Sequence, residues 1–281
     1  MPFTTVRDTH VHYESEGRGP GLVLVHGTGG DAEKVFGNVV PYFADDHTVV
    51  RPNFSGSGLT GDNGDPLTLD LVAAQVAGAA RAAVDGPVDL LGFSLGAVAA
   101  AAVAAEHPGL VRRLVLVAGW SHSTGPRDRF YFETWLKLGR TDRELFKRFS
   151  ALTGYGTSAL DGFGHDGLAG YLEDPWPPAG MLRQIELGLH VDIRGLLPRI
   201  TAPTLVVGFA DDAMIPIAGS RDLHAAIPGS RLVEVPGQGH MDWFADPSGL
   251  ASLTRSFLDD SDGTDDMGDT GGPDDTTAPA A

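Results

Sequence analysis

The stretch Val88-Asp-Leu-Leu-Gly-Phe-Ser-Leu-Gly96 decides how this chain is interpreted, because it joins an apolar run to a serine and then to a helix. Its second half has the form Gly-x-Ser-x-Gly. The Ala-rich run from Leu95 to Glu106 follows directly and ends at His107-Pro108. A strand-to-helix turn this sharp leaves no room for flanking side chains, which explains the two glycines. The pattern predicts that Ser94 is exposed at a helix N-terminus, where the helix dipole favours developing negative charge.

A nucleophilic serine requires a base, and the base requires an orienting acid. His240 is the best candidate base, because it lies between the last apolar run and the last predicted helix. The acid is expected between nucleophile and base in the chain order Ser, Asp, His. Asp211 and Asp212 both meet this condition, since both follow the apolar run Thr204–Val207. We favour Asp212, because it keeps the usual spacing to Pro216, and Asp211 is the alternative.

Two backbone N–H groups are needed to stabilise an oxyanion. One is predicted at Leu95, directly after the nucleophile. The second is predicted at Thr28, within the Gly-rich stretch His26-Gly-Thr-Gly-Gly30 that follows the apolar run Gly21–Val25.

Short apolar runs alternate with helical stretches along the chain, and this alternation predicts an α/β fold with a mostly parallel central sheet flanked by helices. Two segments ahead of these runs, Thr4–Arg7 and His10–Glu14, are predicted to form an antiparallel pair. Leu67–Val84 is a further predicted helix. The predicted buried strands are Gly21–Val25, Thr48–Val50, Val88–Leu91, Leu114–Val117 and Thr204–Val207, with Arg231–Val235 nearer an edge.

Residues 121–200 interrupt this alternation and are too long for a crossover connection, so we predict an inserted helical lid. Its expected helices are Arg127–Leu138, Arg143–Leu152 and Met181–Leu189. The interval holds ten of the chain's 22 aromatic residues, which predicts an apolar pocket wall. The candidate substrate-binding residues are Trp120, Phe130, Trp135 and Met241. The predicted domains are a core in two parts (1–120 and 201–258), the lid (121–200) and a disordered acidic tail (259–281).

The composition limits the classes of protein that this chain can belong to. A formal net charge of −17 argues against nucleic acid and anionic membrane surfaces as partners. The tail carries −8 of this charge, and the predicted lid is neutral. The chain contains no cysteine, which removes thiolate nucleophiles and disulfides. No signal sequence or membrane span is visible, so we expect a cytoplasmic protein that acts on a small molecule, as a monomer or a homodimer.

Together these motifs resemble the α/β-hydrolase superfamily, in its lidded serine hydrolase branch of esterases, lactonases and haloperoxidase-like enzymes. The resemblance covers residues 3–258 and rests on the His26–Gly30 stretch, the Ser94 turn, Asp212 and Gly239-His240. One departure is visible at Ser55, where the family often has arginine. A nucleotide-binding Gly-x-Gly-x-x-Gly match at residues 56–61 lacks the helix that such a site requires.

The resemblance implies a cofactor-free and metal-free hydrolase that cleaves an ester, thioester or lactone of a mainly apolar compound through an acyl-enzyme on Ser94. Three alternatives stay open at this point. A perhydrolase would use the same triad with peroxide in place of water. A C–C bond hydrolase would need lid groups such as His122 or Arg127 to polarise a second carbonyl. A binding protein or a cyclase would use the pocket without the nucleophile.

Overall fold

The computed structural model describes residues 1–61 and 63–260, which are built on an eight-stranded sheet with the order β1-β2-β4-β3-β5-β6-β7-β8. β1 pairs antiparallel with β2 and β2 with β4, and the remaining neighbours are parallel. The predicted mostly parallel sheet is therefore confirmed. The strands are β1 (Phe3–Val6), β2 (Thr9–Gly17), β3 (Gly21–Val25), β4 (Thr48–Pro52), β5 (Val88–Phe93), β6 (Val111–Val117), β7 (Thr204–Phe209) and β8 (Arg231–Val235).

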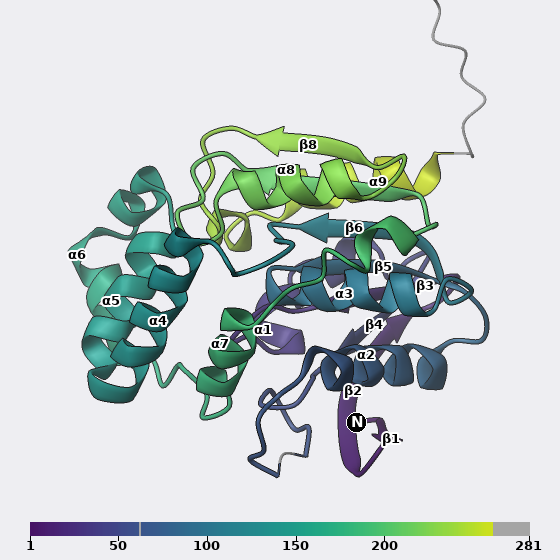
Figure 1. The fold of residues 1–281 in the computed structure, drawn as a ribbon, viewed down its shortest axis with the longest axis horizontal. Coiled ribbons are helices and arrows are strands. Elements are labelled where there is room, and N and C mark those ends of the chain that lie inside the picture. Colours follow the sequence, from purple (N-terminus) through teal and green to yellow (C-terminus); the bar gives the residue numbers. More distant parts are fainter. Residues whose placement is uncertain (62, 261–281) are drawn as a thin grey trace, which may run out of the picture.

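The parallel strands end at one edge of the sheet. In Figure 1 the arrowheads of β6 and β8 point toward the helices α4 (Pro126–Thr141), α5 (Arg143–Gly154) and α6 (Thr157–Glu173) at the left of the molecule. The loops after β3, β5, β7 and β8 therefore gather at this edge, which is where open α/β sheets bind their ligands. The tail predicted over residues 259–281 lies, from residue 261 on, outside the described residues.

Helices cover both faces of the sheet, because alternate residues of the buried strands point in opposite directions. Val23 and Val25 belong to the core cluster that includes α2 (Leu69–Ala83) and α3 (Leu95–Glu106). Leu22 and Leu24 belong to the cluster on the opposite face. That second face is covered by α1 (Ala32–Phe36) and α9 (Ser248–Asp259), while α8 (Ile217–Ala226) contributes to the core cluster on the face of α2 and α3.

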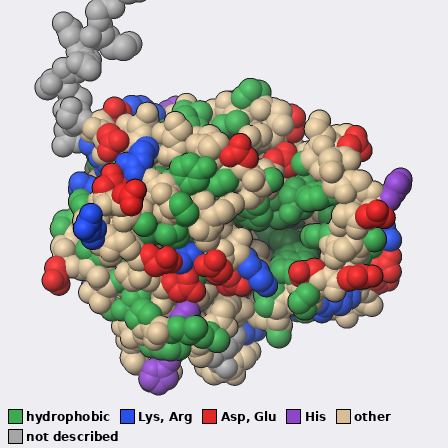
Figure 2. Space-filling view, turned by 180° about the vertical axis from the view of Figure 1, so that it is seen from behind, with side chains coloured by type: hydrophobic (Ala, Val, Ile, Leu, Met, Phe, Trp, Pro, Cys, Tyr) green, Lys and Arg blue, Asp and Glu red, His purple; other side chains and the backbone are tan. Residues whose placement is uncertain are grey.

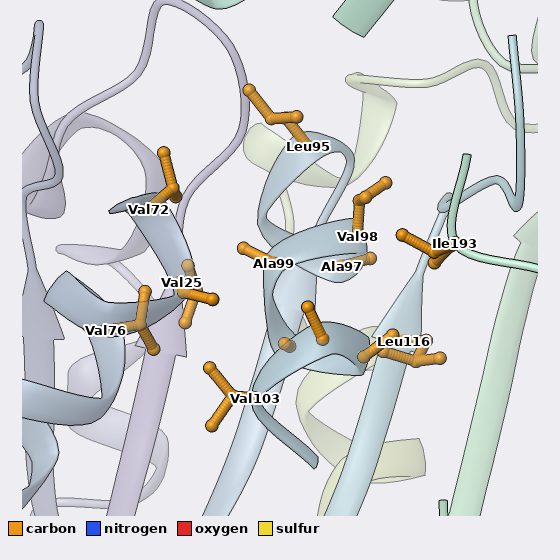
Figure 3. Packing of buried hydrophobic residues seen from close by; sticks show 14 of the residues in the cluster. Val25, Val72, Val76, Leu95, Ala97, Val98, Ala99, Val103, Leu116 and Ile193 are labelled. Atoms are coloured by element: carbon orange, nitrogen blue, oxygen red, sulfur yellow. The ribbon is translucent and has the colours of Figure 1, made fainter. Parts of the chain in front are cut away.

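The Ala-rich helix α3 is buried on all sides except at its C-terminal residue, Glu106. Figure 3 shows Val103 of α3 on the side of Val76 from α2, and Val98 beside Ile193 from the segment after α7. Small side chains let the helix lie close to the sheet and to its neighbours at the same time. Ser94 thus directly precedes the most completely buried helix that the structure describes.

Four helices lie between β6 and β7, and we call residues 126–189 the α4–α7 segment. They are α4 (Pro126–Thr141), α5 (Arg143–Gly154), α6 (Thr157–Glu173) and α7 (Met181–Leu189). The helix α6 was not predicted, because four glycines obscure its pattern. It has no buried residue, and Gly164 (φ 62°) kinks it. The buried Lys147 of α5 supports its end by donating to the Leu172 carbonyl at 2.7 Å.

Most predicted elements match the structure, with shifts of at most three residues at their ends. Thr9–Gly17 and Val111–Val117 are the strands that extend furthest beyond their predicted bounds. The N-terminal antiparallel pair and the edge position of β8 are confirmed. Among residues 1–61 and 63–260, no helix has the length and apolar character needed to cross a membrane.

Candidate active site

Ser94 occupies a strained turn between β5 and α3. It has a positive φ of 57°, which side-chain-bearing residues rarely adopt, and such strain is concentrated at functional sites. A Cβ atom at Gly92 would lie 2.2 Å from the Gly96 carbonyl oxygen, and one at Gly96 would lie 2.1 Å from the Val25 carbonyl oxygen. Both positions therefore require glycine. Ser94 is 6% exposed, less than the sequence suggested, because it faces a cavity that core loops and the α4–α7 segment line.

A chain of hydrogen bonds links Ser94 to His240 and Asp212. The Ser94 Oγ lies 3.0 Å from His240 Nε2, and His240 Nδ1 lies 2.5 Å from Asp212 Oδ2. The exposed fractions of His240 and Asp212 are 2% and 5%. This arrangement allows the imidazole to take a proton from the hydroxyl while the carboxylate holds the opposite ring nitrogen.

The structure brings Asp212, and not Asp211, to the histidine. The second oxygen of Asp212, Oδ1, accepts the N–H groups of Met214 at 2.8 Å and Ile215 at 2.7 Å, so the carboxylate is held from both sides. The side chain of Asp211 is exposed, and its backbone N–H donates to the Gln238 carbonyl at 3.1 Å. Of the two candidate acids, only Asp212 has the geometry of an orienting acid.

The loop that carries His240 is connected to the α4–α7 segment. The backbone N–H of Met241 donates to the Gly154 carbonyl at the end of α5, at 2.8 Å. The Asp242 carboxylate accepts the N–H of Gly239 at 2.7 Å and the N–H of Gly156, just before α6, at 3.0 Å. His240 is therefore positioned partly by contacts of its loop with the α4–α7 segment.

The two predicted oxyanion donors belong to the first turn of α3 and to the loop after β3. The Leu95 N–H belongs to the first turn of α3, where N–H groups lack helical acceptors. In the loop after β3, the Gly29 N–H already donates to Gln184 Oε1 at 2.7 Å, and the Gly30 N–H donates to the Gly27 carbonyl at 3.2 Å. Gly27 and Thr28 also line the cavity, and neither donates its N–H to another described residue, so the predicted donor Thr28 has an N–H group available at the cavity.

A cavity of about 460 Å³ lies above Ser94 and His240. Core loops and the α4–α7 segment both line it, and three of the chain's five methionines contribute to it. Figure 2 shows a hollow with hydrophobic side chains in its walls and charged groups at its rim. Its apolar lining residues are Val35, Phe93, Trp135, Tyr155, Tyr171, Trp176, Met181, Met214, Met241 and Phe244.

Two of the four predicted substrate-binding residues line this cavity, namely Trp135 and Met241, and two do not. Phe130 is 76% exposed, because the buried face of α4 is formed by Tyr131, Phe132, Trp135 and Leu136 and residue 130 lies off that face. Trp120 lines a separate cavity of about 350 Å³ together with His122 and Arg127. Phe130 and Trp120 were predicted to bind substrate beside Ser94, and the structure places neither of them at that cavity.

His122 and Arg127 were considered as groups that polarise a second carbonyl of a C–C hydrolase substrate. The structure places both at the second cavity rather than beside Ser94. The Arg127 guanidinium is engaged by main-chain carbonyls, donating to Met214 at 3.0 Å and also to Ala213. Arg127 thus supports the loop that carries Asp212, and neither residue has the position that C–C bond hydrolysis would need.

Several lining residues were missed by the sequence analysis. Met181 and Met214 gave no signal beyond being apolar, and Tyr171 lies on the unpredicted helix α6. Gln184 does not line the cavity, but the sequence could have singled it out, because it is a polar residue on the apolar face of the predicted helix Met181–Leu189. Among residues 1–61 and 63–260, no group of three or more His, Cys, Asp or Glu side chains is placed to hold a metal ion.

His26 begins the loop that carries Thr28, and it is fully buried against Phe54 with a ring separation of 4.1 Å. Burial lowers the pKa of His26 from 6.5 to about 4, although its contact with the Gly27 carbonyl and the charge of Asp31 act in the opposite direction. The folded protein therefore keeps His26 neutral in a pH range where the unfolded chain binds a proton.

We expect acidification from pH 7.0 to 4.5 to lower the free energy of unfolding by about 2–3 kcal/mol through His26 alone, since stability falls wherever the unfolded state binds more protons. Urea unfolding at the two pH values measures the loss. His26→Gln should show a correspondingly smaller loss, and His10→Gln, at an exposed histidine, should behave like the unaltered protein. Equal losses for the His26 variant and the unaltered protein would contradict the assignment.

The sheet order, the strained serine between β5 and α3 and the His–Asp pair after the last strands define the class of α/β hydrolases. The chain belongs to this family, since the model described as alpha/beta hydrolase fold matches residues 20–247.

Curated relatives resemble nearly the whole chain. It is 42% identical over 263 residues to pyrrolizixenacetamide deacetylase of Xenorhabdus hominickii, which covers 92% of this chain and 98% of that protein. It is 30% identical over 248 residues to a pimeloyl-(acyl-carrier protein) methyl ester esterase of Neisseria meningitidis, covering 85% of this chain and 76% of the relative.

Among solved structures, the enol-lactonase of Burkholderia xenovorans matches with a TM-score of 0.80 at 20% identity, covering 92% of this chain and 99% of the other. An alpha/beta hydrolase enzyme from a Medee basin deep-sea metagenome library matches with a TM-score of 0.84 at 18% identity, covering 92% and 98%. At these identities the structural likeness supports the fold alone.

Proposed function

We propose that this protein is a serine hydrolase that cleaves an acyl–oxygen or acyl–nitrogen bond of a mainly apolar small molecule through an acyl-enzyme on Ser94. The hydrogen-bonded chain from Ser94 through His240 to Asp212, at the floor of an apolar cavity, is the observation that carries this proposal. A serine hydroxyl is a weak nucleophile unless a base removes its proton, and this chain supplies the base.

In the acylation step the Ser94 Oγ attacks the substrate carbonyl while His240 Nε2 takes the hydroxyl proton. The negative charge that develops on the carbonyl oxygen is stabilised by the N–H groups of Thr28 and Leu95. His240 then donates its proton to the leaving oxygen or nitrogen, and the bond to the leaving group breaks. Asp212 stays ionised and stabilises the imidazolium throughout.

In the deacylation step a water molecule takes the place of the leaving group, and His240 removes its proton. The resulting hydroxide attacks the acyl carbonyl, and the charge again forms at the N–H groups of Thr28 and Leu95. Collapse of this intermediate breaks the acyl–Oγ bond and returns the proton to Ser94, so no cofactor enters the balance.

The cavity and the relatives together define the substrate class. A mainly apolar lining of aromatic and methionine side chains suits an uncharged ring or chain, and methionine adapts to irregular shapes. One relative is named as a deacetylase of an acetamide and another as a methyl ester esterase. We therefore include amides with esters and lactones, with acetyl as the first acyl group to test. Residues 121–200 would serve as the lid over this cavity.

The test is covalent labelling with a fluorophosphonate probe, followed by peptide mapping and by assays with p-nitrophenyl acetate and p-nitroacetanilide. We expect stoichiometric labelling on Ser94, hydrolysis of the ester and slower hydrolysis of the amide. A folded protein that neither takes up the label nor releases nitrophenol would overturn the proposal and would favour a binding role for the cavity.

A further inference from the structure

The amide side chain of Gln184 forms a buried junction between α7 and two core loops. Its Oε1 accepts the Gly29 N–H at 2.7 Å, and its Nε2 donates to Ser57 Oγ at 2.9 Å and to the Ser55 carbonyl at 3.2 Å. Gln184 is 0% exposed. A buried amide with this many partners is held in one orientation, because any rotation would leave polar groups unpaired.

A second side chain of the α4–α7 segment holds the other side of Gly29. The indole Nε1–H of Trp176 donates to the Gly29 carbonyl at 3.0 Å. Gly29 has a φ of 71°, which favours glycine, and a Cβ atom there would lie 2.4 Å from Met181 Sδ and would displace the Met181 side chain. The α4–α7 segment therefore fixes both peptide groups that flank Gly29.

We propose that Gln184 is a positioning residue for the oxyanion hole, because its Oε1 fixes the Thr28–Gly29 peptide and thereby the direction of the Thr28 N–H. The inference rests on the proposed function, in which Thr28 donates to the oxyanion. The Thr28 N–H lies in the peptide directly before the one that Gln184 holds, so rotation of that peptide would move the donor. Preorganised donors lose much of their effect when displaced by about 1 Å.

The position of Ser55 makes the role of Gln184 specific to this chain. Where the family often has arginine, Ser55 and its neighbours instead form a network of neutral groups. Gln75 of α2 accepts the Ser55 N–H at 2.9 Å and donates to Ser55 Oγ at 2.8 Å, and Gln184 binds the Ser55 carbonyl. The Ser55 carbonyl is thus one of the groups that hold the Gln184 amide, while Gln75 holds the N–H and the hydroxyl of Ser55.

The same network provides a matched control. Gln75 is as buried as Gln184 and also bonds to Ser55, but its side-chain hydrogen bonds go to Ser55 and not to Gly29. Gln75→Met and Gln184→Met each replace a buried amide by an apolar chain of similar length. Both are expected to lower the Tm, and only the second removes a group that holds the oxyanion loop.

The experiment measures kcat and KM for p-nitrophenyl acetate in both variants. We expect Gln184→Met to lower kcat roughly 10- to 100-fold with KM changed less than about threefold, since an interaction made in the transition state is lost. Gln75→Met should keep kcat within about threefold.

A second measurement separates positioning from general destabilisation. A boronic acid adds to Ser94 Oγ and places a charged oxygen among the oxyanion donors, so its affinity should fall in Gln184→Met in proportion to kcat/KM. Equal kcat in the two methionine variants, or unchanged boronate affinity in Gln184→Met, would overturn the inference while leaving the proposed function standing. An unaltered protein that neither hydrolyses the ester nor labels on Ser94 would overturn both.

Discussion

Replacing Ser94 by alanine is expected to lower kcat/KM for p-nitrophenyl acetate at least about 10⁴-fold, because the acyl-enzyme cannot form without the Oγ nucleophile. The measurement is steady-state ester hydrolysis with the expressed variant, together with its thermal unfolding. We expect a Tm close to that of the unaltered protein. Alanine occupies the same strained turn with a positive φ, and the hydroxyl makes its 3.0 Å contact with His240 alone among the described groups.

The loss of kcat/KM in Ser94→Ala should not grow when His240 is replaced as well. His240→Ala alone is expected to cost about as much as Ser94→Ala, and the double variant no more than either, because residues that act as one unit show non-additive effects. Additive losses, or retention of a tenth of the activity in Ser94→Ala, would show that ester cleavage takes place elsewhere. His107→Ala, outside the cavity and at the end of α3, serves as the histidine control.

Much of the sheet could be predicted because its strands are short apolar runs bounded by turn residues. β3 and β8 match their predicted bounds, and β2 was underestimated because Ser15 and Glu16 are exposed at its end. The helix α6 was missed for a physical reason. Its glycines carry no helical preference and none of its residues is buried, so neither propensity nor apolar periodicity marks it.

Some residues of the candidate site could likewise be predicted from the sequence, and others could not. Ser94 and its two glycines follow from local sterics, since a turn between β5 and α3 has no room for side chains. The choice between Asp211 and Asp212 depends on the path of the loop after β7. Local spacing in the sequence favours Asp212 but does not determine that path. Phe130 and Trp135 differ only by their phase on α4, and that phase is set by packing against α5 and α7.

The described structure also shows that the two halves of the site depend on each other. The loops that carry His240 and Asp212 are bonded to the α4–α7 segment, through Gly154 and Arg127 respectively. Gln184 and Trp176 hold the loop that carries Thr28. A change in how these helices lie over the core would therefore move His240, Asp212 and Thr28 as well as the cavity wall.

Asp212→Asn is expected to lower kcat roughly 10³- to 10⁴-fold at pH 7 with little loss of stability. An asparagine oxygen can still accept the N–H groups of Met214 and Ile215, so the loop keeps its shape. Its NH₂ group then faces His240 Nδ1 and requires that nitrogen to be an acceptor. The proton consequently sits on Nε2, toward Ser94, and the imidazole cannot take the hydroxyl proton. Steady-state kinetics and urea unfolding measure the two effects.

Asp211→Asn is the matched control, because it makes the same chemical change one residue earlier on an exposed side chain. We expect kcat within about threefold of the unaltered protein. Asp212→Ala should lose activity as Asp212→Asn does and should also lose stability, since two buried N–H groups are left without their acceptor. A large loss in Asp211→Asn combined with an active Asp212→Asn would reverse the assignment. Asp211 would then be the residue whose carboxylate holds His240.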